Sequence, residues 1–117
     1  MRDHTKLKAF KLADELALVV YRSTVRFPKA EQFGLTSQMR RAAVSVASNI
    51  VEGAARKSLA DYLRFLDMSY GSARELQYQV SLSHRLGLLR AEDHERLKAS
   101  CIETTKVIHG LITSLRK

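Results

Sequence analysis

The sequence predicts an all-α protein: an antiparallel bundle of four helices that run up, down, up and down. The chain has 117 residues, the length of one ordinary domain, so residues 1–117 are taken as a single domain. One proline and five glycines are too few for the many tight turns of a β-sandwich or barrel. Apolar side chains recur every three or four residues along four segments. We therefore expect helices at about 7–26, 35–54, 59–87 and 91–115.

The first predicted helix has one charged face and one apolar face. Its charged stripe consists of Lys8, Lys11, Glu15, Arg22 and Arg26. The opposite face consists of Phe10, Ala13, Leu16, Ala17, Val20 and Tyr21. Leu18 falls within the charged stripe, which is ordinary for a single surface leucine. The helix is expected to end before Phe27 and Pro28, because the residue preceding a proline is disfavoured in the α region.

The second predicted helix is apolar on two opposite sides, and its start is expected to be capped by Thr36 or Ser37. One side is an ordinary core stripe of Met39, Ala43, Val46 and Ile50, and the other carries Val44, Ala47 and Val51. A helix apolar on both sides must be covered on both. Self-association would supply the second cover, and the alternative is that the other three helices wrap this one. The candidate oligomer interface is Leu18, Val44, Ala47, Ser48 and Val51.

The third predicted helix begins with a capping pattern, in which Ser58 precedes Asp61 by three residues. A seam with heptad spacing follows: Leu59, Tyr62, Leu66, Ser69, Ala73, Leu76, Val80 and Ser83. Gly71 lies inside the helix and costs up to about 1 kcal/mol relative to alanine, which suggests that a neighbouring helix packs against its bare backbone. Gly87 is a suitable C-terminal residue.

The fourth predicted helix places acidic Glu92 and Asp93 at its start and basic Arg116 and Lys117 at its end, as the helix dipole favours. Its apolar stripe consists of His94, Leu97, Cys101, Thr104, Ile108, Leu111 and Leu115. The connections at 54–58 and 87–91 are short, so successive helices are expected to be antiparallel neighbours.

The charge is the unusual feature of the composition. The formal net charge is +8, and residues 1–57 hold 11 basic and 5 acidic side chains. Such a surplus predicts a polyanionic partner, most often a nucleic acid, either RNA or DNA, with generic solubility as the alternative. No aromatic platform interleaves the cations, which favours recognition of backbone or shape. The candidate nucleic-acid-binding residues are Lys6, Lys8, Lys11, Arg22, Arg26, Lys29, Arg41, Arg56 and Lys57.

Catalytic, metal and membrane signatures are lacking in the sequence. There is no glycine-rich phosphate loop, no Gly-x-Ser-x-Gly and no His-Glu-x-x-His, so we expect a non-enzymatic protein without metal or cofactor. Cys101, the single cysteine, is interpreted as a small core residue and excludes a disulfide framework. Near the N-terminus, the longest uncharged apolar run covers only 16–21, so we expect no membrane span and a cytoplasmic protein.

A second set of polar residues gathers on and beside the second predicted helix. Arg40, Asn49, Glu52 and Glu75 are interpreted as structural. The two glutamates are expected to pair with arginines within or between subunits, since such pairs fix register more reliably than they add stability.

Residues 34–53 (GLTSQMRRAAVSVASNIVEG), followed by Arg56 and Ser58, resemble the signature of the bacterial four-helix-bundle proteins encoded in 23S ribosomal RNA intervening sequences. Residues 71–76 (GSAREL) are similar to a second signature of that family, and residues 7–21 fit its first helix. Phe10 stands where the family often has tryptophan, and Ala47 where it often has proline. Both departures concern packing, and the missing proline predicts a straighter second helix.

The resemblance implies a homopentamer arranged as a barrel. Distant relatives include accessory proteins of diversity-generating retroelements, similar basic pentamers that bind RNA and a reverse transcriptase. The resemblance therefore implies an oligomeric module that binds structured RNA or an RNA–protein complex, such as a reverse transcriptase with its RNA. The alternative is a structural scaffold that docks a protein partner, its positive charge being incidental.

Overall fold

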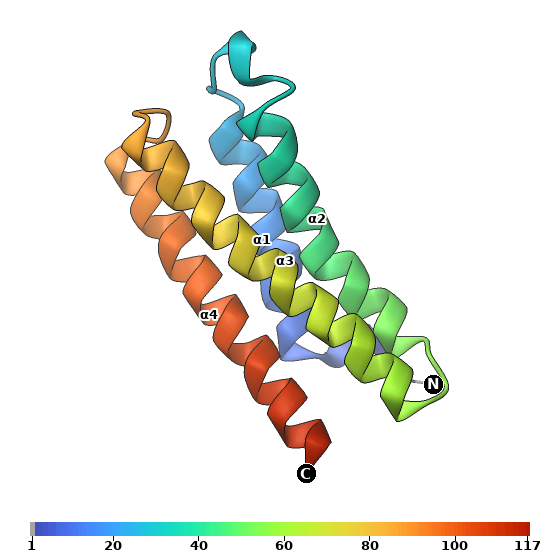
Figure 1. Ribbon diagram of the computed structural model, residues 1–117. Helices are drawn as coiled ribbons and strands as arrows, with labels where there is room; N and C mark the ends of the chain where they lie inside the picture. The colour runs from blue at the N-terminus through green and yellow to red at the C-terminus, as the bar shows by residue number, and fades with distance from the viewer. Residues whose placement is uncertain (1) are drawn as a thin grey trace.

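The computed structural model describes residues 2–117, and that part of the chain contains helices and no strand (Figure 1). The four long helices are α1 (Lys8–Thr24), α2 (Leu35–Ala54), α3 (Leu59–Arg85) and α4 (Ala91–Arg116). Two short 3₁₀ helices accompany them, η1 (His4–Lys6) and η2 (Lys29–Glu31). The predicted all-α class is confirmed.

The long helices pack side by side, each against two neighbours. α1 contacts α2 and α4, and α3 also contacts α2 and α4. Across residues 2–117, no Cα atoms of the diagonal pairs α1–α3 and α2–α4 lie within 8 Å of each other. The chain therefore runs up and down around the bundle, and both termini lie at the end that holds the α2–α3 turn (Figure 1). The molecule measures 43 × 23 × 19 Å.

The ends of two helices differ from the prediction. α1 ends at Thr24, two residues earlier than expected, where the Thr24 hydroxyl donates to the carbonyl of Val20 at 2.8 Å. α3 ends at Arg85, and Gly87 adopts a positive φ of 76° beyond it. The amide of Gly87 bonds the carbonyl of His84, and the amide of Leu88 bonds that of Ser83. Gly87 thus provides the glycine of a Schellman motif, as its identity suggested.

One of the two predicted caps is present. The Ser58 hydroxyl accepts a hydrogen bond of 3.0 Å from the amide of Asp61 at the start of α3. The expected cap on α2 is wrong, because α2 begins at Leu35, before Thr36 and Ser37. There the Glu31 carboxylate reaches forward and accepts from the amide of Leu35 at 3.1 Å.

The core is built from the predicted stripes. One half, towards the α1–α2 and α3–α4 loops, includes Leu16, Met39, Leu76 and Leu97, and the other includes Ala13, Val46, Ile50, Leu66 and Ile108. Of the predicted α3 seam, all members are buried except Leu59, which is 46% exposed in the first turn. Serine hydroxyl groups join α3 to α2 through hydrogen bonds. The Ser69 hydroxyl donates to the carbonyl oxygen of Val46 at 2.7 Å, and the hydroxyl groups of Ser45 and Ser72 share a hydrogen bond of 2.8 Å.

The close approach of α3 occurs at Gly53 of α2, not at Gly71. A Cβ at Gly53 would lie 2.9 Å from the Cβ of Phe65 and 3.3 Å from the carbonyl oxygen of Tyr62. A Cβ at Gly71 would meet no atom within 4 Å. The expectation that a helix of the same chain packs against Gly71 is therefore wrong, because Gly71 faces outward.

These two glycines should respond oppositely to alanine. Gly53→Ala is expected to lower the free energy of unfolding by about 1–2 kcal/mol, since overpacking exceeds the gain in helix propensity. Gly71→Ala, the matched control, should raise it by about 0.5–1 kcal/mol. Urea denaturation measures both. A Gly53→Ala protein as stable as the wild type would contradict the role of this glycine in setting the α2–α3 separation.

Candidate functional site

The nine candidate nucleic-acid-binding residues divide between the two ends of the bundle. At the end with the termini lie Lys6 of η1, Lys8 and Lys11 of α1, and the α2–α3 turn with Arg56 and Lys57. The amide of Arg2 bonds the carbonyl of Ala54 at 3.3 Å and so joins the two chain segments there. At the opposite end lie Arg22, Arg26, Lys29 and Arg41. Lys11 and Arg22 are separated by about 16 Å along α1.

Most of these cations have no carboxylate partner. Arg22 approaches Glu15 and Arg56 approaches Glu52, each at 4.0 Å and with well-exposed side chains. Contacts this long and exposed neutralise little. The other seven are exposed, and none lies within 4.0 Å of a carboxylate among residues 2–117: Lys6, Lys8, Lys11, Arg26, Lys29, Arg41 and Lys57.

Aromatic rings hold several arginines in place at the end with the termini, which the sequence analysis missed. The Arg2 Cζ lies 4.2 Å from the centroid of the buried Tyr62 ring, and its Nη1 donates to the carbonyl of Arg56 at 2.8 Å. Arg56 and Arg64 lie 4.6 and 4.7 Å from the centroid of Phe65. Burial raises the pKa of Tyr62, and Arg2 opposes that rise. The contact between Arg64 and Phe65 is suggested by their adjacency in the sequence. The contact between Arg2 and Tyr62 becomes apparent only in the folded chain.

Two further arginines, also missed, join Arg22 and Arg26 at the opposite end. Arg90 precedes α4 and Arg96 lies in its second turn, and both line one hollow together with Arg22 and Arg26. We call the space lined by these four arginines and Ser23 the arginine hollow. The contact between α1 and α4 brings them together across some 65 residues of sequence, so no local pattern reveals them.

The residues interpreted as structural have differing surroundings. Arg40 ties α2 to the end of α1: its Nε donates to the Thr24 hydroxyl at 2.9 Å and its Nη2 to the carbonyl of Tyr21 at 3.3 Å. Asn49 donates to the carbonyl of Ser45 at 2.9 Å. Glu52 meets only Arg56, and Glu75 is exposed without an ion pair among the described residues. The expected pairing of Glu75 with an arginine is therefore not found within the chain.

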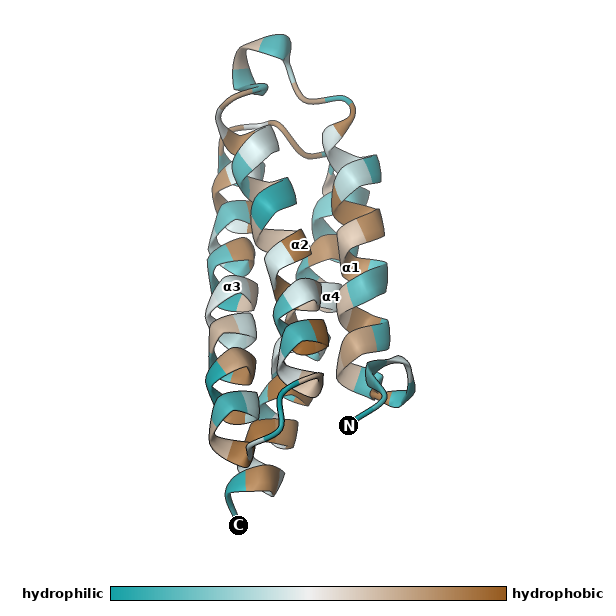
Figure 2. Ribbon diagram, turned by 90° about the vertical axis from the view of Figure 1, so that its right-hand side faces the viewer, coloured by the Kyte–Doolittle hydropathy of each residue, from teal (hydrophilic) through white to brown (hydrophobic). Residues whose placement is uncertain are grey.

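The candidate oligomer interface lies on the outer face of α2 and the adjoining side of α1. Val44 is 43% exposed and Leu18 is 46% exposed, while Ala47 and Val51 are half-buried. Ser48 is exposed and donates to the carbonyl of Val44 at 2.8 Å. Apolar residues recur along both helices (Figure 2).

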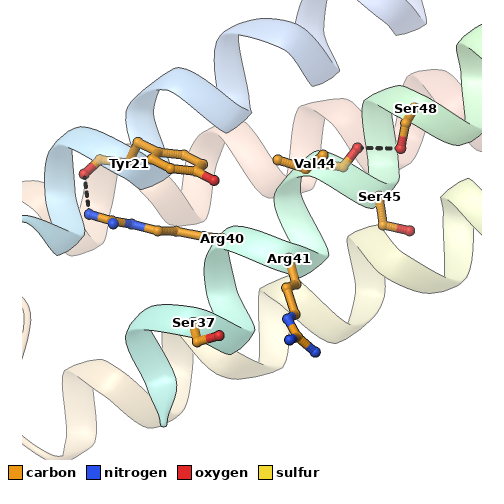
Figure 3. Close-up of a pocket in the computed structure, with 7 residues that line it drawn as sticks. All are labelled: Tyr21, Ser37, Arg40, Arg41, Val44, Ser45 and Ser48. Carbon is orange, nitrogen blue, oxygen red and sulfur yellow. Dashed lines mark hydrogen bonds between the residues drawn. The ribbon is translucent and has the colours of Figure 1, made fainter. Parts of the chain in front are cut away.

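A shallow depression lies on this face, lined by Tyr21, Ser37, Arg40, Arg41, Val44, Ser45 and Ser48 (Figure 3). Arg40 extends beneath the Tyr21 ring, with its Cζ 4.6 Å from the ring centroid, and Arg41 points the other way (Figure 3). On α2, exposed or half-buried residues with heptad spacing run along the outer face: Ser37, Arg41, Val44, Ser48 and Val51. A second helix seated there would bury Val44 and Tyr21.

The remaining reactive side chains lie in the bundle interior or at its edge. Cys101 is fully buried, and burial raises the pKa of its thiol to about 12, so the thiol stays protonated at neutral pH. The His84 and His94 rings stack with centroids 3.8 Å apart where α3 and α4 meet. In residues 2–117, no three side chains of histidine, cysteine, aspartate or glutamate gather as metal ligands, and none of the helices is long and apolar enough to cross a membrane.

Comparison with known proteins relates this geometry to one family. Residues 5–110 match the family model described as 23S rRNA-intervening sequence protein. A similar fold occurs in a 1.70 Å crystal structure of a protein with unknown function from the S23 ribosomal protein family of Bacteroides thetaiotaomicron. The two share 23% sequence identity and a TM-score of 0.80, over 89% of this chain and 97% of the other. No curated protein matches the chain.

Proposed function

The chain belongs to the family of 23S rRNA-intervening sequence proteins, and on that premise we propose that it is a non-enzymatic, basic, oligomeric module that binds structured RNA or an RNA–protein complex. The observation that carries the proposal is the set of seven exposed cations without a carboxylate partner in the described chain. Unpaired surface cations are the groups that displace counterions from phosphates. Arginines held against aromatic rings lose less side-chain freedom when they bind a phosphate.

Self-association is the second element of the proposal. The outer face of α2 presents Val44 and Ser48, and the adjoining α1 presents Leu18 and Tyr21. We propose that this face packs against another copy and that the copies close into a pentameric barrel. Five copies of +8 would carry about +40, and repeated weak sites would gain affinity through avidity. A cytoplasmic location is part of the proposal, because a lone thiol stays reduced there.

A salt titration of binding tests the RNA proposal. Nuclease-treated protein is titrated with a structured RNA, a DNA duplex and an acidic polypeptide between about 50 and 200 mM salt. We expect a preference for RNA that persists at the upper concentration, with a steep linear dependence of log K on log salt. Equal, weak binding to all three that vanishes at the upper concentration would overturn the proposal.

The alternative function is a scaffold that docks a protein partner. The observation in its favour is the apolar surface around α1: Val25 is 71% exposed and Phe33, in the loop that follows, is 88% exposed. A pulldown dominated by one protein after nuclease treatment would favour this alternative.

A further inference from the structure

We propose that the arginine hollow binds a phosphate group of the RNA backbone, and this inference rests on the proposed RNA-binding function. The hollow is an open surface depression where the end of α1 meets the start of α4. Arg22 and Arg26 come from one helix end, and Arg90 and Arg96 from the other.

The guanidinium groups of the hollow outnumber its carboxylates. Asp93 and Glu92 are the acidic residues that line it. Asp93 is already engaged, since its Oδ1 accepts from Nη2 of Arg96 at 2.8 Å. This contact orients Arg96 without occupying Arg26 or Arg90, neither of which has a carboxylate within 4.0 Å in residues 2–117. Planar guanidinium groups match phosphate oxygens with two parallel hydrogen bonds.

Two further groups in the hollow lack hydrogen-bond partners. Ser23 lines it and is only 7% exposed, and its buried hydroxyl has no hydrogen-bond partner among the described residues. The Ser23 oxygen has almost no solvent-accessible surface, as have the unpaired oxygens of Gln79 and Thr104, so it does not by itself indicate a ligand. The start of α4 is also uncapped, because Arg90 makes no side-chain cap bond and the first backbone bond of the helix is donated by His94. Free amides and the helix dipole favour an anion there.

The phosphate chemistry fits this end of the molecule better than the other. At the end with the termini, Arg2, Arg56 and Arg64 rest against aromatic rings, and the other candidate cations of η1 and α1 are three flexible lysines. At the arginine hollow, four arginines and the first turn of α4 line one space. Convergent, oriented donors distinguish a binding site from a diffuse cationic surface.

The double variant Arg26→Gln/Arg90→Gln tests the site. Fluorescence anisotropy with a labelled RNA hairpin is measured across a salt series. We expect affinity to fall at least tenfold and the slope of log K against log salt to flatten by about 2, one per lost phosphate contact. The matched control Arg74→Gln/Lys106→Gln removes the same charge from exposed, unpaired positions on α3 and α4 and should weaken binding less than about threefold. Circular dichroism establishes that both variants fold.

The outcomes separate this inference from the proposed function. An equal loss in both double variants, or a larger loss in Lys8→Gln/Lys11→Gln, would overturn the arginine hollow as the site while RNA binding stands. If the wild type binds no RNA, the proposed function fails. The hollow is then tested by adding inorganic phosphate and measuring amide chemical shifts by nuclear magnetic resonance. Shifts confined to the amides of Ser23, Ala91 and Glu92 would support a site for a free phosphate ester. Their absence would overturn the inference.

Discussion

Leu16→Ala is expected to lower the free energy of unfolding by about 2–5 kcal/mol, the largest stability effect of a single truncation on α1. Leu16 is 0% exposed and belongs to the half of the core that contains Met39, Leu76 and Leu97. Truncation removes apolar surface from the core and leaves a cavity that helices on both sides can only partly fill. Urea denaturation at a fixed protein concentration measures the change.

Leu18→Ala is the matched control, made two residues away on the same helix. Leu18 is 46% exposed, so the same truncation should change the stability of the protomer by less than about 0.5 kcal/mol. Because Leu18 belongs to the candidate oligomer interface, the variant should instead weaken assembly. Equal losses of stability in the two variants would contradict the separation of core and outer face on α1.

Val44→Asp is expected to convert the assembly into folded protomers. A carboxylate on the outer face of α2 would have to be desolvated when a second copy covers it. Arg40 already donates to Thr24 and Tyr21, so Arg41 is the nearby arginine left to pair with it (Figure 3). Light scattering should give a mass near 13.2 kDa for the variant and a multiple of it for the wild type. Helical content by circular dichroism should be unchanged.

Ala99→Asp, at an exposed position of α4, is the control for added charge and should leave the assembly intact. A wild-type mass of a single chain would show that the outer face of α2 is not covered by another copy. Dissociation of both variants would show that net charge, and not the position of Val44, controls assembly.

The core and most of the element boundaries follow from local spacing. Met39, Val46 and Ile50 recur at helical steps and are all buried, and the cap at Ser58 needs only its own turn. The outward position of Gly71 could have been predicted from its spacing to the buried seam of α3. Gly71 lies two residues from both Ser69 and Ala73, which is about 200° around the helix from each, so it points away from them. The cap of α2 was missed because Glu31 reaches Leu35 from η2, a 3₁₀ helix too short to show any periodicity.

The candidate binding surfaces are only partly predictable from the sequence, for a different reason. Net charge and the apolar outer face of α2 are properties of short segments. Val44 could therefore be predicted from the sequence as an interface residue, and the lysines as nucleic-acid-binding residues. The arginine hollow depends on which helices close the bundle, and α1 and α4 meet only in the folded chain. Arg90 and Arg96 were for that reason indistinguishable from ordinary helix-end arginines.

The contact between α1 and α4 also has a consequence for how the protein folds. The interfaces between consecutive helices join segments linked by short or moderate loops, and contacts of this kind form early because little loop-closure entropy opposes them. Only α1–α4 joins the two ends of the chain, so its formation is the step with the largest entropic cost. The arginine hollow sits on that seam. A nascent or partly unfolded chain that has paired α2, α3 and α4 already carries its positive charge, yet its four arginines line one hollow only when the bundle closes.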